Sequence, residues 1–211
     1  MNIIGIVVAC ENEIITILKS KFKLISMLDE KPYKTFLYEI ENKKVYVSLS
    51  GIGETSSSAC TQFLITKYNV NLIFNYGACG SLRKDLNLTN VVFISKLIDV
   101  GFDDPIMKIN ESFINYAKNN FPSIEQVICA SNNVFIDDEK EKENINKEYN
   151  ASICEMEASG IYLTCLKNNV DCFFIKSVSD TVSGGKEEYE KFATLAANEA
   201  LNILANFIKN Y

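Results

Sequence analysis

Histidine is absent from this sequence of 211 residues, and arginine occurs once, at Arg83. Without histidine, the chain cannot build Ser–His or Cys–His nucleophile pairs, histidine-ligated zinc sites or imidazole acid–base catalysis. Proton transfer must therefore use carboxylates, lysine, tyrosine, cysteine or water. A single arginine also excludes a cluster of guanidinium groups around a phosphate.

Long apolar runs and basic clusters are missing as well. The formal charge of −6 argues against nucleic acid or an anionic membrane as a partner, and no run reaches the ~18 apolar residues that a membrane span needs. Residues 1–14 have no positive region ahead of their apolar part, so we expect no secretory leader. The seven cysteines, odd in number and without CxxC spacing, indicate reduced thiols and a cytoplasmic location.

A single domain over residues 1–211 is expected, because no composition shift or Pro/Gly/Ser-rich linker divides the chain. Apolar or β-branched runs predict strands at 2–9, 71–78, 90–98, 125–131, 133–136 and 171–179, and a hairpin from 34–41 and 43–50. Amphipathic or charged stretches predict helices at 11–22, 54–68, 111–121, 137–149 and 186–211, and one beginning near Met156. This alternation predicts a three-layer α/β/α sandwich around a mixed sheet.

Ligand sites in such folds lie at the carboxyl ends of strands. Four unusual segments follow predicted strands: ACENE (9–13), SGIG (50–53), NYGACGS (75–81) and SVSD (177–180). Each also has a purely structural explanation, since acids favour a first helical turn, glycines allow tight turns, and Ser or Asp can cap a helix. A dinucleotide loop at SGIGETS would need a third glycine where Ser56 stands. No cofactor and no metal ion are therefore expected.

The segment ICEMEASG (153–160) sets two carboxylates, Glu155 and Glu157, among apolar and very small side chains. A buried carboxylate without a partner costs several kcal/mol, so each must reach solvent, a donor or a ligand. At a strand-to-helix junction, one of two acids spaced by two residues can cap the helix while the other faces a pocket. The spacing alone leaves open which of the two acids caps the helix and which faces the pocket.

Six segments, in their order along almost the whole chain, resemble the purine nucleoside phosphorylase/uridine phosphorylase superfamily, and within it the 5′-methylthioadenosine/S-adenosylhomocysteine nucleosidases. They are ACENE (9–13), SGIG (50–53), NYGACG (75–80), VFI (134–136), EMEA (155–158) and VSD (178–180). The resemblance implies a nucleoside phosphorylase-like fold with a partly barrel-like sheet. It also implies a purine nucleoside as substrate, water as co-substrate, and a homodimer.

The resemblance implies a role for each matching residue. Glu13 would position and activate the attacking water, Glu157 would accept hydrogen bonds from the ribose hydroxyls, and Asp180 would protonate the purine at N7. Phe135 would stack on adenine, and the backbone of Ile136 would read the base edge. The remaining residues would line the ribose and 5′ regions or flank the acid: Met156, Ala78, Gly80, Ile52, Tyr189 and Ser179.

These residue types fit cleavage of an N-glycosidic bond on chemical grounds. The reaction creates an oxocarbenium-like sugar and a purine that leaves poorly as an anion, so a proton on the base lowers the barrier. Asp180 must be protonated when it acts, and we expect apolar surroundings to raise its pKa. Glu13 must stay ionised, which an accessible turn would favour. One acid and one base with water between them is the arrangement of inverting glycoside hydrolysis.

Three alternatives stay open. A phosphate-dependent purine nucleoside phosphorylase would need several arginines, and Arg83 has no arginine partners. Other nucleosides, including futalosine-type ones, would suit a chain with Lys176 where the nucleosidases usually carry arginine and Ala78 where serine is common. The short segment 95–105 also differs from the longer one that closes the neighbour's 5′ pocket in those enzymes. A nucleoside sensor without turnover would not need a water activator such as Glu13.

Overall fold

The computed structural model describes residues 3–20, 22–101 and 106–210. Within them the chain forms ten strands and six helices. The strands are β1 (Ile4–Val8), β2 (Lys23–Glu30), β3 (Tyr33–Ile40), β4 (Lys43–Leu49), β5 (Leu72–Ser81), β6 (Val91–Asp99), β7 (Ile106–Lys108), β8 (Glu125–Ser131), β9 (Ile153–Glu155) and β10 (Asp171–Asp180). The helices are α1 (Glu11–Leu18), α2 (Glu54–Tyr68), α3 (Glu111–Asn120), α4 (Glu139–Tyr149), α5 (Ala158–Asn168) and α6 (Gly185–Asn210).

All ten strands belong to one mixed sheet, part of which closes on itself. The order runs β10-β6-β8-β9-β5-β1-β4-β3-β2, and β10 also pairs with β5 in parallel, so that β5, β10, β6, β8 and β9 form a ring. Apolar side chains fill the space between this ring and the C-terminal helix; for example, the Phe173 and Phe207 rings stack with centroids 4.9 Å apart. The strands of the ring are buried on both faces, which explains their nearly continuous apolar sequences.

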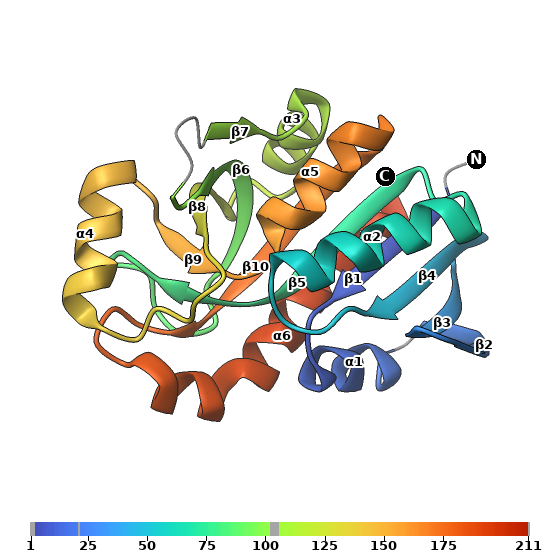
Figure 1. The fold of residues 1–211 in the computed structure, drawn as a ribbon, viewed down its shortest axis with the longest axis horizontal. Coiled ribbons are helices and arrows are strands. Elements are labelled where there is room, and N and C mark those ends of the chain that lie inside the picture. Colours follow the sequence, from blue (N-terminus) through green and yellow to red (C-terminus); the bar gives the residue numbers. More distant parts are fainter. Residues whose placement is uncertain (1–2, 21, 102–105, 211) are drawn as a thin grey trace.

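Helices cover both faces of the sheet (Figure 1). Helices α2 and α5 pack together on one side, whereas α1 and α6 pack together on the other, and α6 lies along β5 and β10. The predicted three-layer α/β/α sandwich around a mixed, partly barrel-like sheet is confirmed. Among the described residues, no helix is both long and apolar enough to cross a membrane.

The structure differs from the local predictions at four places. Residues 133–136 form no strand, because the chain leaves the sheet after the Asn132 N–H donates to the Glu155 carbonyl, at 2.9 Å. Strand β2 was not predicted, since a bulge between Leu24 and Ser26 breaks its alternation and leaves apolar side chains exposed. Helix α1 ends at Leu18, short of the predicted residue 22, and α5 begins at Ala158 rather than near Met156. Residues 102–105 of the segment 95–105 lie outside the described residues.

The parallel strands β1, β4, β5 and β10 carry the sequence segments of interest to the same edge of the sheet. β1 pairs with β4 and β5, and β5 pairs with β10, in each case in parallel. The register between β5 and β10 shifts between Val178 and Asp180, so that Asp180 faces Gly80. A bulge of this kind re-aims a side chain at the end of a strand.

Helices α2 and α5 approach closely at Gly160. A Cβ added there would lie 2.8 Å from the carbonyl carbon and 2.9 Å from the Cα of Glu54. Alanine in a helix is normally about 1 kcal/mol more stable than glycine, but this backbone contact cannot give way as a side chain would. We expect Gly160→Ala to lower the free energy of unfolding by about 1–3 kcal/mol in urea titrations. Lys167→Ala, at an exposed position of the same helix, should change it little; a stabilised Gly160→Ala would contradict the close packing.

Candidate active site

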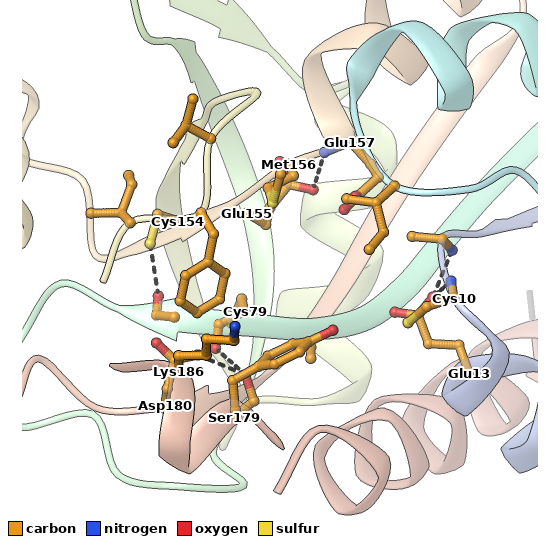
Figure 2. Close-up of a pocket in the computed structure, with 18 residues that line it drawn as sticks. Cys10, Glu13, Cys79, Cys154, Glu155, Met156, Glu157, Ser179, Asp180 and Lys186 are labelled. Atoms are coloured by element: carbon orange, nitrogen blue, oxygen red, sulfur yellow. Dashed lines mark hydrogen bonds between the residues drawn. The ribbon is translucent and has the colours of Figure 1, made fainter. Parts of the chain in front are cut away.

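A cavity of about 340 Å³ opens at the carboxyl ends of β1, β4, β5 and β10 (Figure 2). It brings together all of the predicted site residues: Glu13, Ile52, Ala78, Gly80, Phe135, Ile136, Met156, Glu157, Ser179, Asp180 and Tyr189. Sequence reasoning did not assign the others that line it: Ala9, Cys10, Cys79, Val134, Cys154, Glu155 and Lys186. Segments from both ends of the chain therefore meet in one chamber.

Glu13 lies in the first turn of α1 and is only 4% exposed, so the expectation of an accessible turn is wrong. Its Oε2 accepts hydrogen bonds from the backbone N–H groups of Ala9 (2.6 Å) and Cys10 (3.1 Å). Burial raises the pKa of Glu13, while Lys176 and these N–H donors oppose the rise. A Cβ at Gly77 would overlap the Glu13 carboxylate. Glycine is therefore required at that position for the carboxylate to reach the cavity.

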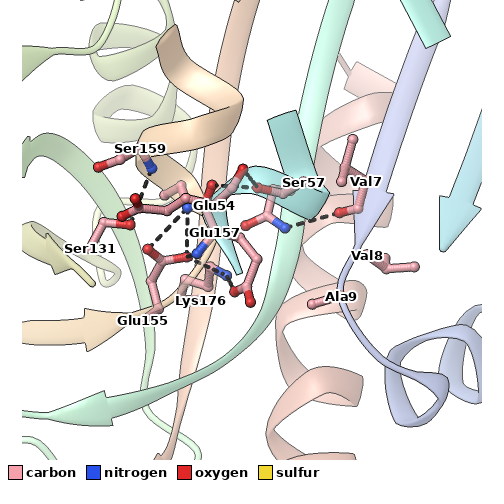
Figure 3. Close-up of polar contacts among 12 residues, drawn as sticks. Val7, Val8, Ala9, Glu54, Ser57, Ser131, Glu155, Glu157, Ser159 and Lys176 are labelled. Carbon is pink, nitrogen blue, oxygen red and sulfur yellow. Dashed lines mark hydrogen bonds and ion pairs between the residues drawn. The ribbon is translucent and has the colours of Figure 1, made fainter. Parts of the chain in front are cut away.

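A fully buried lysine lies close to Glu155 of β9 and to Glu157, the residue before α5 (Figure 3). The Lys176 Nζ is 3.1 Å from Glu155 Oε2 and 3.8 Å from Glu157 Oε2. Burial lowers the pKa of Lys176, but Glu155, Glu157 and Glu13 outweigh it and raise that pKa above its ordinary value. Lys176 therefore stays charged and provides the counter-charge for the carboxylates around it.

Glu155 satisfies the start of α5 and Glu157 lines the cavity, which agrees with the place that the family resemblance implies for Glu157. Glu155 accepts hydrogen bonds from the backbone N–H groups of Glu157 (3.0 Å) and Ala158 (3.0 Å), and so satisfies donors at the start of α5. Glu157 instead points across the cavity wall, where its Oε1 accepts from the Gly53 N–H at 3.2 Å. Burial raises the pKa of Glu157 to about 7, although Lys176 opposes the rise. Near pH 7 the Glu157 carboxyl group is therefore close to the midpoint between its neutral and its ionised form.

Asp180 occupies another side of the cavity and pairs with a second buried lysine. Its Oδ2 is 2.6 Å from Lys142 Nζ, and its Oδ1 accepts a hydrogen bond of 2.8 Å from Ser179 Oγ. Burial raises the pKa of Asp180, as the sequence led us to expect, but the Lys142 ammonium and Ser179 oppose this rise. The charge beside Asp180 was not foreseen.

Aromatic and aliphatic side chains form the remaining walls. The rings of Phe135 and Tyr189 meet edge to face, with centroids 5.5 Å apart. Ile52 and Val134 are 56% and 64% exposed at the rim of the cavity. These side chains form flat, apolar surfaces that suit an aromatic ring system and an apolar substituent.

The cysteines of the cavity are not activated nucleophiles. Burial raises the pKa of the Cys10 and Cys154 thiols to about 12, and it raises that of Cys79 well above its usual range. A thiol must be deprotonated to attack, so these groups stay neutral near pH 7. Within the described residues, no group of three or more His, Cys, Asp or Glu side chains has the geometry of a metal site.

The burial of Lys176 could be predicted from the sequence, whereas that of Lys142 could not. Lys176 interrupts the apolar run FFIKSVS, and a charge inside a predicted core strand signals a buried partner. Lys142 lies in DDEKEKENINKEY, where nearly every side chain is polar, so nothing distinguishes it from a surface residue. The predicted surface helix is correct for most of α4 but not for Lys142, which is fully buried.

The sequence profile of the phosphorylase superfamily matches residues 3–209. A 5′-methylthioadenosine/S-adenosylhomocysteine nucleosidase of Staphylococcus aureus (strain bovine RF122 / ET3-1) is 29% identical to this chain. The alignment, 221 positions long, covers 92% of this chain and 93% of that protein. Among solved structures, the nucleosidase of this name from Helicobacter pylori, with butyl-thio-DADMe-Immucillin-A, has a TM-score of 0.93 at 22% identity and covers 100% and 99% of the two chains. The futalosine hydrolase of H. pylori strain 26695 has a TM-score of 0.92 at 23% identity, with coverage of 100% and 98%. The last two establish a shared fold.

The raised pKa of Glu157 predicts how stability depends on pH. A carboxyl group with a pKa of about 7 in the folded chain and 4.5 otherwise stabilises the fold below pH 4.5 and loses this contribution as the pH rises through 7. The loss amounts to about 3 kcal/mol for a shift of this size. We expect urea unfolding of the wild type to show lower stability at pH 8 than at pH 5, and Glu157→Gln to show a smaller difference. Glu187→Gln, on the exposed first turn of α6, is the control. An unchanged pH dependence in Glu157→Gln would refute the assignment.

Proposed function

Because the chain belongs to the phosphorylase superfamily, we propose that it hydrolyses the N-glycosidic bond of a purine nucleoside, releasing the base and a ribose. The substrate class that fits best is 5′-methylthioadenosine or S-adenosylhomocysteine, with adenine and a 5-thio-substituted ribose as products. The observation that carries the proposal is the presence of Glu13 and Asp180 on opposite sides of one cavity (Figure 2). A base for water and an acid for the leaving group need this separation.

On the sugar side, Glu13 takes a proton from water as the water attacks C1′ of the ribose. Two backbone N–H groups hold one carboxylate oxygen, which fixes its direction before substrate arrives. Glu157 accepts hydrogen bonds from the ribose hydroxyls, and Met156 contributes soft apolar contact beside it. Positive charge that develops on the sugar then meets carboxylates for which Lys176 is the nearest cation.

On the base side, Asp180 protonates N7 as the bond between C1′ and N9 breaks and its electron pair moves to N9. Ser179 orients the carboxyl group through a hydrogen bond to Oδ1. Phe135 stacks on the purine, and the backbone of Ile136 recognises the base edge. Ala78 and Gly80 line the cavity floor near the ribose, where the absence of long side chains leaves room for substrate.

Charge favours water over phosphate as the co-substrate. Arg83 is held by Asp85 and Glu125, each at 2.6 Å, and it lines a different surface hollow. Of the described residues that line the catalytic cavity, Lys186 is the basic one, and its side chain is 69% exposed. A phosphate dianion beside the ribose would face carboxylates without a cluster of arginines, which makes phosphorolysis the weaker alternative.

The 5′ specificity rests on the apolar rim. Ile52, Val134 and Tyr189 offer uncharged contacts, which suit a thioether better than a 5′-hydroxyl. The S. aureus relative carries the name of a methylthioadenosine/adenosylhomocysteine nucleosidase. The fold is shared with a futalosine hydrolase as well, so futalosine is the competing nucleoside.

We also infer a cytoplasmic homodimer. The exposed side chains of Ile52 and Val134 leave the 5′ side of the cavity open in the single chain, and a second copy would cover it. Light scattering after gel filtration should give twice the chain mass of 23.7 kDa. A monomer at assay concentrations would overturn this inference.

Assays of purine release distinguish hydrolysis from phosphorolysis and from nucleoside binding without turnover. We expect release from methylthioadenosine, adenosylhomocysteine or futalosine without phosphate, and a fall in kcat of about 10²–10⁴-fold in Asp180→Asn and in Glu13→Gln. Asp171→Asn, at the exposed start of the same strand β10, is the matched control and should keep full activity. Strict phosphate dependence would indicate a phosphorylase instead, whereas tight nucleoside binding with no release would indicate a sensor.

A further inference from the structure

Lys142 is fully buried although it lies on α4, a helix made almost entirely of polar residues. Its Nζ donates to Asp180 Oδ2 at 2.6 Å and to the backbone carbonyl of Thr181 at 2.8 Å. Asp180 lines the cavity and Lys142 does not, so the ammonium lies behind the carboxyl group as seen from the substrate site.

Anchoring of α4 does not explain this ion pair. The helix is held by the buried side chain of Ile145, by the Glu141 N–H that donates to the capping Asp138 side chain, and by the Asn146 amide that donates to the Ala151 carbonyl. Two charges withdrawn from water usually stabilise a fold no better than apolar side chains of the same size. A buried pair placed directly against the cavity points to a chemical role.

We propose that Lys142 is a positioning residue that supplies Asp180 with the proton used to protonate the departing purine. The proposal rests on the hydrolase function proposed above and deepens it. The two side chains together hold one proton more than an ionised carboxylate and a neutral amine. The acid of the reaction is then the pair, with Asp180 as the member that touches the base.

The proton balance closes over one turnover. The Lys142 ammonium gives a proton to Asp180, and Asp180 gives one to N7 as the electron pair of the glycosidic bond moves to N9. Water forms the new bond to C1′ and loses a proton to Glu13. Glu13 then releases its proton to solvent, and Lys142, left as a neutral amine, takes one up. Nucleoside and water have become free base and ribose, and the protein returns to its starting state.

The geometry also explains how an acid can work beside a cation. Burial raises the pKa of Asp180, and Lys142 opposes that rise. The other ionisable groups facing the pair are Glu188 on α6, Cys79 on β5 and Cys154 on β9; Glu188 accepts from the Thr181 N–H at 2.7 Å. Lys186 of α6 lines the same cavity. An ammonium retains its proton at pH values where a carboxyl group has lost its own.

The test is the pH profile of kcat/KM for purine release by the wild type, Lys142→Met, Lys142→Arg and Lys84→Met. Lys84 pairs with Glu139 and Glu143 of α4 on the surface, so its removal is the matched loss of an ion pair to that helix. Lys142→Met leaves Asp180 in an apolar site, where burial keeps it protonated at low pH. We expect activity within about threefold of wild type at pH 5.5 and a loss of about 100-fold at pH 9, the scale of general acid catalysis.

Arginine distinguishes proton supply from mere charge. A guanidinium group keeps the positive charge but does not give up its proton in proteins, so Lys142→Arg should lose about 100-fold at every pH. Lys84→Met should follow the wild-type profile. Rescue by Lys142→Arg, or a Lys142→Met profile parallel to that of the wild type, would overturn the proposal while the hydrolase function stands. A wild type that releases no purine under any condition would overturn both.

Discussion

The buried charge of Lys176 is the interaction on which the site depends. Without it, Glu13, Glu155 and Glu157 would be carboxylates in an apolar interior with no ammonium group to balance their charge, which costs several kcal/mol for each ion. Lys176 lies on β10, which pairs with β5 and β6 and so belongs to the closed ring of the sheet. The closed ring of strands thus fixes the position of the Lys176 ammonium. The carboxylates at the starts of α1 and α5 lie around this charge.

The two buried lysines, which lie behind carboxyl groups that line the cavity, have different roles. Lys176 contacts two carboxylates and is strongly held as a cation, which suits a site where positive charge develops on a sugar. Lys142 contacts one carboxyl group and a backbone carbonyl, an arrangement in which a proton can move along a short hydrogen bond. A chain with a single arginine and no histidine therefore obtains both a fixed charge and a mobile proton from the same residue type.

The sequence predicted the fold well where local patterns and tertiary packing agree. Helix α2 and strand β8 have their predicted boundaries, and α2 begins at Glu54, where the sequence places capping residue types in the first turn. Strand β2 was not predicted, because its exposed apolar residues interrupt the alternation of apolar and polar residues that marks a strand. Residues 133–136 have the composition of a strand, yet Phe135 and Ile136 line the cavity and do not pair with another strand.

The site was predictable in its membership but not in its electrostatics. The resemblance carried by the ordered motifs located the residues around the cavity, and all of the motifs except VFI (134–136) lie at the end of a strand. Burial of Glu13 and the partner of Asp180 depend on contacts between segments far apart in the chain, and no local pattern encodes them. Lys142 and Asp180, for instance, are 38 positions apart.

The charge balance of the cavity has a consequence for the choice between nucleosides and nucleotides. Glu13, Glu155 and Glu157 all interact with the Lys176 ammonium, and when the three carboxyl groups are ionised we expect the chamber to disfavour anions. Nucleotides would then be disfavoured by charge before shape is considered, and the chamber would favour nucleosides without a phosphate group. Discrimination of this kind needs no dedicated gate, because the groups that stabilise a cationic sugar are the ones that repel phosphate.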